Sequence, residues 1–379
     1  MDIRSKAIKE NIDLERELDI SFDNEDTIYP MNNLKVEKGF YTVFELKRKF
    51  DSNNKRIILD SNFQRDDVWG NEKKSELIES VLMGLPLPIF YFNQDKYGRL
   101  IVVDGRQRLT ALFDFLDDKL ILRKLKILRE LNDKKFSQLS PVLAGRIEDY
   151  QIQAHVIMPP TPDRIKFDIF DRVNRGGMQL NKQEIRNALY QGYATELLKQ
   201  ITCGERFRLA TGDAFKKERR MKDKYLITRF LSLYLYDKGV LQDDDGCRYA
   251  YKGDRDELFG KGLEYVNKMQ QIAIKKLKNV IEDGLYKSYY YLGKDAFRTI
   301  NNGVRSPINM NIFEAVMFIM NEITDEIPKI IVEKRVHEFI ASDLFIDNIG
   351  NHRDSKNKLE WRIESSKKVG KSLKEKYDK

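Results

Sequence analysis

Two arginines and a glutamine stand where an apolar segment meets a helical pattern, in the stretch LIVVDGRQRLTAL at residues 100–112. The apolar residues predict a buried strand that ends at Asp104, followed by a helix from Gly105. The first turn of a helix has N–H groups without intrahelical partners, which makes it a natural anion site. Arg106 and Arg108 would add positive charge and multidentate donors beside it. The pattern therefore predicts a phosphate site at this turn.

A second interpretation of the same stretch needs no ligand. Asp104 would be the N-cap of the helix, Gln107 would reach back to it, and the arginines would be exposed to solvent. This does not explain a second Gln-Arg pair, Gln64-Arg65, which also lies between a predicted strand and a predicted helix. Because the ends of neighbouring strands meet at one edge of a sheet, we expect both pairs to face one pocket. Asp104 or Asp66 would be available there to hold a metal ion on the phosphates.

The elements that must position these residues fall into two parts of different character. Up to about residue 160, alternation and turn residues predict short strands mixed with helices. The strands are expected at 56–60, 89–92, 100–103 and 151–157, and the helices at 42–50, from 71 and from 105. The later segments are helical, expected from Thr161 to the "NRGG" at 174–177, from a capping box at Asn181 and Glu184, and at 224–236, 258–278, 312–322 and 328–341.

These elements predict an α+β chain. We expect an acidic N-terminal arm or helix at 1–35, a small mixed α/β domain at 36–160, and an all-α helical domain with a basic C-terminal tail at 161–379.

Positive charge is concentrated in two zones of this 379-residue chain, whose net charge is +8. Residues 206–229 hold nine basic and three acidic side chains, and the stretch from Arg353 onward holds ten and five. Such zones favour a polyanion, and DNA is the partner we expect, although they are also typical of solvated helix faces. The candidate nucleic-acid contacts are Lys216, Lys217, Arg219, Arg220, Lys222 and Lys224.

Composition also predicts the compartment. The chain has two cysteines, Cys203 and Cys247, which argues against a secreted disulfide framework and fits a reducing cytoplasm. The first thirty residues carry nine acidic side chains and no apolar run, so we expect no signal peptide. With no apolar segment of about 20 residues, we expect a cytoplasmic protein without a membrane partner.

The segments "FQRDDVW", "ELIESVLMGLPLPIFYF" and "GRLIVVDGRQRLTALFDFL" together resemble the N-terminal domain of GmrSD-type, modification-dependent restriction systems, whose hallmark is a D-G-Q-Q-R motif. The likeness covers about residues 40–120, with a further piece, "FDIFDRVNRGGMQLNKQEIRNAL", at 167–189. That family is related to the ParB and sulfiredoxin fold, in which a similar G-x-x-R turn binds nucleotide phosphates. The resemblance implies a ParB/sulfiredoxin-like domain that binds Mg²⁺ and a nucleoside triphosphate and acts with DNA in restriction or phage defence.

The resemblance further implies a nucleotide site built from three segments. Its members are Asp104, Gly105, Gln107 and Arg108, with Gln64 and Arg65 from the earlier loop, and with Asn174, Gly176 and Gly177 close by. Asp104, Gln107 and Arg108 would be the catalytic groups, and Asp104 the Mg²⁺ ligand. A helix C-cap remains the alternative for the two later glycines.

Arg106 departs from the family pattern, because it stands where relatives usually have glutamine and would join the nucleotide-binding residues. A glutamine could orient an attacking water, whereas an arginine favours phosphate binding, so binding is better supported than hydrolysis. We therefore expect a Mg²⁺-dependent nucleoside triphosphatase or a nucleotide-sensing switch.

Full-length relatives carry a His-Asn-His nuclease domain, which needs several histidine or asparagine groups around a metal. This chain has three histidines, His155, His337 and His352, without such a cluster, and His155 in its alternating strand is expected to be packed. We therefore expect a separate partner to supply any nuclease. Two alternatives stay open: a catalytically silent DNA- or partner-binding module that uses the same Gln/Arg pocket, and a DNA endonuclease dependent on His352.

Overall fold

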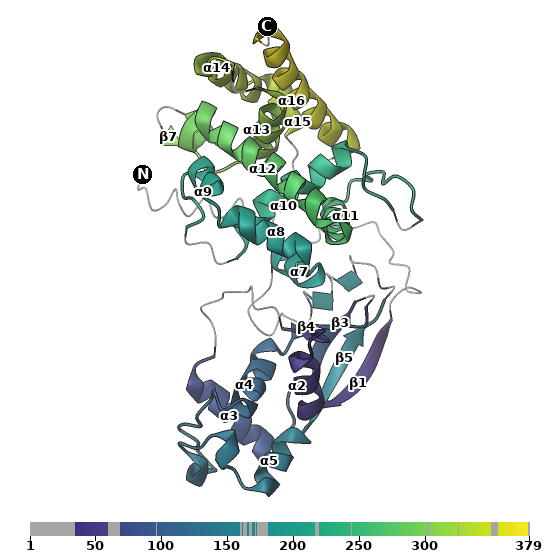
Figure 1. Ribbon diagram of the computed structural model, residues 1–379, viewed down its shortest axis with the longest axis vertical. Coiled ribbons are helices and arrows are strands. Elements are labelled where there is room, and N and C mark those ends of the chain that lie inside the picture. The colour runs from purple at the N-terminus through teal and green to yellow at the C-terminus, as the bar shows by residue number, and fades with distance from the viewer. Residues whose placement is uncertain are drawn as a thin grey trace. The chain divides into compact units, whose positions relative to one another are not determined.

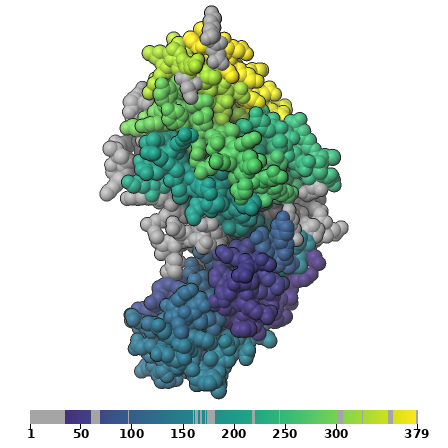
Figure 2. Space-filling model, in the orientation of Figure 1, coloured from purple at the N-terminus to yellow at the C-terminus, as the bar shows by residue number. Residues whose placement is uncertain are grey.

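The computed structural model describes residues 35–59, 69–95, 97–159, 161, 165–166, 169–170, 172, 181–216, 220–243, 245–301, 304–324, 326–349 and 355–377. The chain divides between Leu180 and Asn181 into two compact units (Figures 1 and 2). We call the described residues up to 172 the mixed unit and those from 181 the helical unit. The expected N-terminal arm, and most of the helix expected from Thr161, lie outside the described residues.

A five-stranded mixed sheet forms the centre of the mixed unit, with strand order β1-β5-β3-β4-β2. The strands are Val36–Thr42 (β1), Ile57–Ile58 (β2), Phe90–Gln94 (β3), Leu100–Asp104 (β4) and Gln151–Ile157 (β5). β3 runs antiparallel to β4 and parallel to β5, while β1 is antiparallel to β5 and β2 is parallel to β4. The four expected strands are confirmed, and β1 was not predicted.

Four helices pack on one face of this sheet (Figure 1). They are Val43–Asp51 (α2), Asn71–Leu82 (α3), Arg106–Leu116 (α4) and Pro141–Glu148 (α5), with short 3-10 turns at Arg129–Leu131 (η2) and Phe136–Gln138 (η3). Their apolar stripes meet the inward side chains of β3, β4 and β5, such as Phe90, Phe92 and Val102, in one core. This packing fixes the end of β4 and the start of α4, where the candidate site lies.

The helical unit consists of ten helices and a short two-stranded hairpin within its described residues. The helices are Lys182–Leu189 (α7), Tyr193–Thr202 (α8), Glu205–Thr211 (α9), Lys222–Asp237 (α10), Arg255–Lys268 (α11), Gln271–Leu292 (α12), Met310–Glu322 (α13), Lys329–Ile340 (α14), Asp343–Asn348 (α15) and Lys356–Tyr377 (α16). The hairpin joins Ile300–Asn301 (β6) to Val304–Arg305 (β7), and a 3-10 turn, Gly293–Asp295 (η4), follows α12. The expectation of an all-α unit is therefore wrong in this one detail.

The helix expected at 258–278 is also wrong, because the chain breaks there into α11 and α12. Met269, the C-cap of α11, adopts an extended backbone with ψ at 150°. Neither Met269 nor Gln270 is a glycine or proline, so the local sequence carries no signal for this break.

Helix α13 is the centre of the helical core. Every residue from Met310 to Met320 is buried, as expected for a helix that is covered on all sides. Helix α16 packs along it, with Leu359 and Ile363 beside Phe318 and with Gly370 close to Ile319. One face of the basic C-terminal stretch is therefore part of the core.

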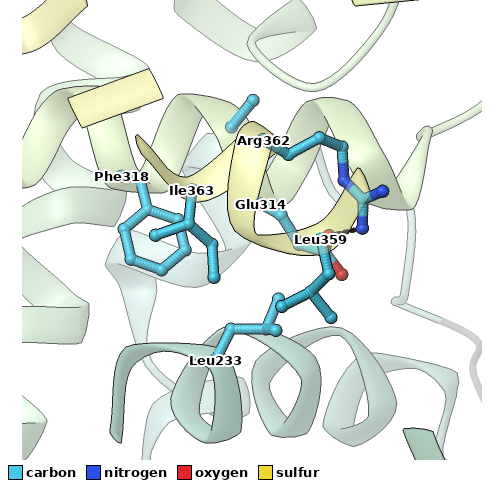
Figure 3. A pocket seen from close by; sticks show the side chains of 7 residues that line it. Leu233, Glu314, Phe318, Leu359, Arg362 and Ile363 are labelled. Carbon is cyan, nitrogen blue, oxygen red and sulfur yellow. Dashed lines mark ion pairs between the residues drawn. The ribbon is translucent and has the colours of Figure 1, made fainter. Parts of the chain in front are cut away.

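A buried ion network joins α10, α13 and α16. Arg229 donates through Nε to Glu314 Oε1 at 2.6 Å, and Arg362 Nη2 lies 3.5 Å from Glu314 Oε2. Figure 3 shows Glu314 and Arg362 facing each other beside Leu233 and Phe318. The crevice that these side chains line is too tight to hold a water molecule. The network therefore holds three helices together and leaves no space for a ligand.

Within the described part of the chain, no helix is long and apolar enough to span a lipid bilayer. Cys203 and Cys247 are both free thiols.

Candidate functional site

The predicted turn between strand and helix is present at the end of β4. Gly105 is the N-cap of α4 and has a left-handed backbone with φ at +96°, which an L side chain rarely adopts. A Cβ at this position would also overlap the ring of Phe90, which is buried in the core. Both the backbone and the neighbouring ring therefore require glycine here.

The alternative interpretation of this stretch, a capping box formed by Asp104 and Gln107, is wrong. The N-cap is Gly105 rather than Asp104, and no side chain caps the first turn of α4. The reason is that Asp104 makes an ion pair with Arg108 at 2.8 Å. Gln107 instead accepts a hydrogen bond from the backbone N–H of Trp69 at 3.4 Å. Trp69 is the first described residue after the segment that holds the second Gln-Arg pair, and Gln107 binds it to the turn.

Arg108 is the most buried charged group at the turn, with 8% of its surface exposed. Its guanidinium donates to the carbonyl oxygens of Pro88 and Ile89 and lies 4.2 Å from the centre of the Phe90 ring. Burial lowers the pKa of Arg108, while Asp104 acts in the opposite direction. Arg108 remains positively charged and anchors Asp104 to the loop before β3.

The end of α4 that meets this turn is electropositive. Its first turn holds Arg106 and Arg108 and no acidic residue, so the side-chain charge adds to the positive end of the helix dipole. The side chain of Asp104 is 38% exposed, compared with 10% for its partner Arg108. Asp104 can therefore meet a ligand from solvent while one of its oxygens stays bonded to the protein.

Several predicted site residues lie outside the described residues. These are Gln64, Arg65, Asp66, Asn174, Gly176, Gly177, Lys217, Arg219 and His352. Of the candidates, the described structure brings together Asp104, Gly105, Arg106, Gln107 and Arg108.

Magnesium needs few protein ligands when it bridges phosphates. No group of three His, Cys, Asp or Glu side chains suited to a metal occurs within the described ranges. A nucleotide-bound Mg²⁺ is commonly held by one or two carboxylates together with phosphate oxygens. The exposed carboxylate of Asp104 is suited to be one of these ligands.

Helix α7 carries an unusual set of buried polar side chains that the sequence alone did not single out as functional. Gln183, Glu184, Arg186 and Asn187 are each at most 1% exposed. The capping box at Asn181 and Glu184 is confirmed, with both hydrogen bonds present. Its spacing predicted the start of the helix, but nothing in the local pattern showed that the polar face is buried.

The polar groups of α7 bond to α10 and α11. Arg186 and Lys182 both form ion pairs with Asp256, and the distance from Lys182 Nζ to Asp256 Oδ2 is 2.9 Å. Gln183 donates to Thr228 at 3.2 Å, and its Oε1 has no hydrogen-bond partner among the described residues. Burial would raise the pKa of Asp256, but its cationic neighbours, Arg186 first, lower it. This network makes α7 a firmly docked first helix of the helical unit.

The basic residues selected as nucleic-acid contacts differ in exposure. Lys216 is exposed and Lys224 is half-buried, whereas Lys222 is only 6% exposed. Arg220 lies 3.5 Å from the buried carboxylate of Glu184, and its backbone oxygen accepts from the side-chain amide of Asn181. Part of this basic zone therefore belongs to the packing around α7.

The two described histidines are not placed together. His155 lies in β5 with its ring 5.4 Å from that of Tyr91, in agreement with the expectation of a packed side chain. His337 is exposed on α14.

A family model, "GmrSD restriction endonuclease, N-terminal domain", matches residues 46–191. No curated protein and no solved structure matches the chain. The matched segment contains β3, β4, the turn at Gly105 and α4, and it extends past the division at Leu180 to include α7. Residues 46–191 are therefore similar to the N-terminal domain of GmrSD restriction endonucleases.

Proposed function

We propose that this protein binds a nucleoside triphosphate with Mg²⁺ at the turn between β4 and α4, and that it acts in a restriction system whose target is DNA. The observation that carries the proposal is the first turn of α4. It has a left-handed glycine as N-cap, no side-chain cap, two arginines and no acidic residue. This combination leaves the positive end of the helix ready for a phosphate.

The contacts around the turn support a division of roles. Arg106, beside the glycine, would contact a phosphate directly. Arg108 would be a positioning residue, because its guanidinium is bonded to two loop carbonyls and to Asp104. Asp104 would hold Mg²⁺ through its exposed side, and the ion would neutralise phosphate charge.

Gln107 would connect nucleotide binding to the rest of the domain, because its side chain bonds to the backbone of Trp69. Gln64 and Arg65 stand five and four residues before Trp69 in the sequence and would complete the pocket, together with Asn174, Gly176 and Gly177. Hydrolysis is a second step of the proposal. The arginine at position 106 favours holding the phosphate over orienting water, so we expect slow turnover.

The test is a thermal-shift panel of nucleoside triphosphates with Mg²⁺. A ligand at 100 times its dissociation constant should stabilise the protein by about 2.7 kcal/mol. Arg106→Ala and Asp104→Asn should remove the shift. The matched control is Asp95→Asn, which breaks an i,i+4 ion pair of the same unit, Asp95–Arg99 at 2.6 Å, away from the turn. Absence of a shift with every nucleotide would refute the proposal.

Two further measurements separate the alternatives. Arg106→Gln should raise phosphate release per bound nucleotide if position 106 governs hydrolysis. If Arg106→Ala weakens DNA binding as much as nucleotide binding, the turn instead serves as a DNA- or partner-binding surface.

A further inference from the structure

An aromatic and cationic stack lies on the helical unit, away from the turn at Gly105 in sequence. Tyr286 and Tyr290 stand one helical turn apart in α12, with ring centres 6.2 Å apart and ring planes at 21°. Arg206 of α9 lies over the Tyr286 ring at 5.5 Å. Helices α9 and α12 pack against each other (Figure 1). Three planar groups from two helices thus form one stack.

The stack faces solvent although its rings are held in place. Tyr286 is 44% exposed and Tyr290 is 47% exposed, and Arg206 is exposed as well. Behind them, Tyr291 is fully buried, meets Tyr290 edge-on at 4.9 Å and donates its hydroxyl to the carbonyl of Thr324. Exposed aromatic groups with a fixed orientation are suited to contact a partner.

The surroundings of the stack favour a negatively charged partner. Lys275 is exposed and stands eleven residues before Tyr286 in α12. Eleven residues are close to three full helical turns, so Lys275 lies on the same face as Tyr286, about 16 Å along the helix. The two carboxylates of α12 are already paired, Glu282 with Lys278 at 3.6 Å and Asp283 with Lys287 at 3.1 Å. The face therefore combines aromatic rings with a net positive charge.

We propose that the surface formed by Arg206, Tyr286 and Tyr290 binds single-stranded nucleic acid. A base extends the stack from its tyrosine end, and the backbone phosphates follow Arg206 and Lys275. Base faces are accessible only where bases are unstacked from a duplex, so this chemistry selects single strands and is tolerant of sequence. The surface goes beyond the proposed nucleotide site, because it lies in the helical unit and needs no nucleotide.

The test measures the affinity of the full chain for a labelled short single strand of mixed sequence and for the matching duplex, by fluorescence anisotropy. One stacked base is worth about 1–3 kcal/mol, which is about 5- to 150-fold in affinity. Tyr286→Ala with Tyr290→Ala should therefore weaken single-strand binding by at least about fivefold and leave duplex binding nearly unchanged. Tyr286→Phe with Tyr290→Phe keeps the rings and should retain the affinity.

The matched control is Tyr97→Ala. Tyr97 is 71% exposed and also lies beneath an arginine, Arg99 at 5.5 Å, but it stands in the mixed unit. This variant should bind the single strand like the unchanged chain. Because all the substituted tyrosines are exposed, the variants should fold normally, and thermal unfolding checks this.

The proposal is overturned if the double alanine variant binds the single strand as tightly as the unchanged chain, or if duplex affinity falls by the same factor. It is also overturned if Tyr97→Ala causes an equal loss. None of these outcomes depends on nucleotide binding, so failure here is distinguishable from failure of the thermal-shift test.

Discussion

Gly105→Ala tests whether the turn between β4 and α4 is built as described. An alanine would have to adopt φ near +96°, and the left-handed conformation costs an L residue about 1–2 kcal/mol. Its Cβ would also overlap the Phe90 ring, and that ring is 1% exposed and has no space to move into solvent. Overpacking of this kind adds about 1–3 kcal/mol. The expected loss in the free energy of unfolding is therefore about 2–5 kcal/mol.

Gly84→Ala is the matched control. Gly84 also has a positive φ, +72°, but nothing lies within 4 Å of the position that its Cβ would take. The expected loss is the backbone cost alone, about 1–2 kcal/mol. The difference between the two variants then measures the Phe90 contact.

The two tryptophans allow the mixed unit to be followed by itself. Trp69 lies in the mixed unit and Trp361 in α16 of the helical unit. In a Trp361→Phe background, denaturant unfolding followed by fluorescence reports on the mixed unit. A separate readout is needed because a chain of two units need not unfold in one step.

Gly105→Ala should also remove the nucleotide-induced thermal shift. The reason is that the Phe90 ring packs against Arg108, which is the ion-pair partner of Asp104.

The result that would refute this reasoning is an equal cost for Gly105→Ala and Gly84→Ala. A double variant sharpens the test. With Phe90→Leu the ring is gone, so adding Gly105→Ala should then cost no more than Gly84→Ala does. If the cost of Gly105→Ala stays the same in both backgrounds, the overlap with Phe90 does not determine the choice of glycine.

Two further predictions concern buried carboxylates. Glu79 is 6% exposed and accepts hydrogen bonds from the backbone N–H groups of residues 126–128; burial would raise its pKa, but these donors lower it. Its contribution to stability is therefore complete above the ordinary pKa of 4.5 and is lost as the pH falls through the lowered value in the folded protein. Glu79→Gln should cost about 1.5–3 kcal/mol at neutral pH and reduce the acid sensitivity of the mixed unit, measured by urea unfolding at pH 7 and in acid. Glu314→Gln should cost about 3–5 kcal/mol in the helical unit, followed through Trp361 in a Trp69→Phe background, because it leaves two buried arginines without their carboxylate. The exposed pair Arg335–Glu338 provides the control, since Glu338→Gln should cost about 1 kcal/mol or less. Equal costs for Glu314→Gln and Glu338→Gln would contradict this account, as would an unchanged acid sensitivity after Glu79→Gln.

The strands and helices with clear periodicity could be predicted from sequence. The segment 151–157 alternates and forms β5 over these same residues, and the stripe at Leu77, Ile78, Val81 and Leu82 is the buried face of α3. Strand β1 could not be predicted in this way. All of its residues are at least partly exposed, and Glu37, Lys38 and Gly39 interrupt any apolar alternation. The exposure follows from the position of β1 at the edge of the sheet, where it pairs only with β5 within the described residues.

The position of the candidate site could be predicted, but its internal contacts could not. The strand, the glycine and the two arginines are visible as a local pattern at 100–108. The partner of Asp104 is decided by tertiary structure, because Arg108 is fixed by the carbonyls of Pro88 and Ile89 and by the Phe90 ring. Local capping preferences therefore gave the wrong partner for Asp104.

The division of the chain at Leu180 has a practical consequence for work on the matched segment. The family segment 46–191 ends with α7, yet the side chains of α7 are bonded to α10 and α11, which lie beyond that segment. A fragment cut at residue 191 would expose Ile185 together with the charged groups of Glu184 and Arg186, all of which are fully buried in the whole chain. Such a fragment would be prone to aggregate. The boundary of the matched segment, residue 191, thus differs from the structural boundary between Leu180 and Asn181. Fragments for expression should retain both units or end before Asn181.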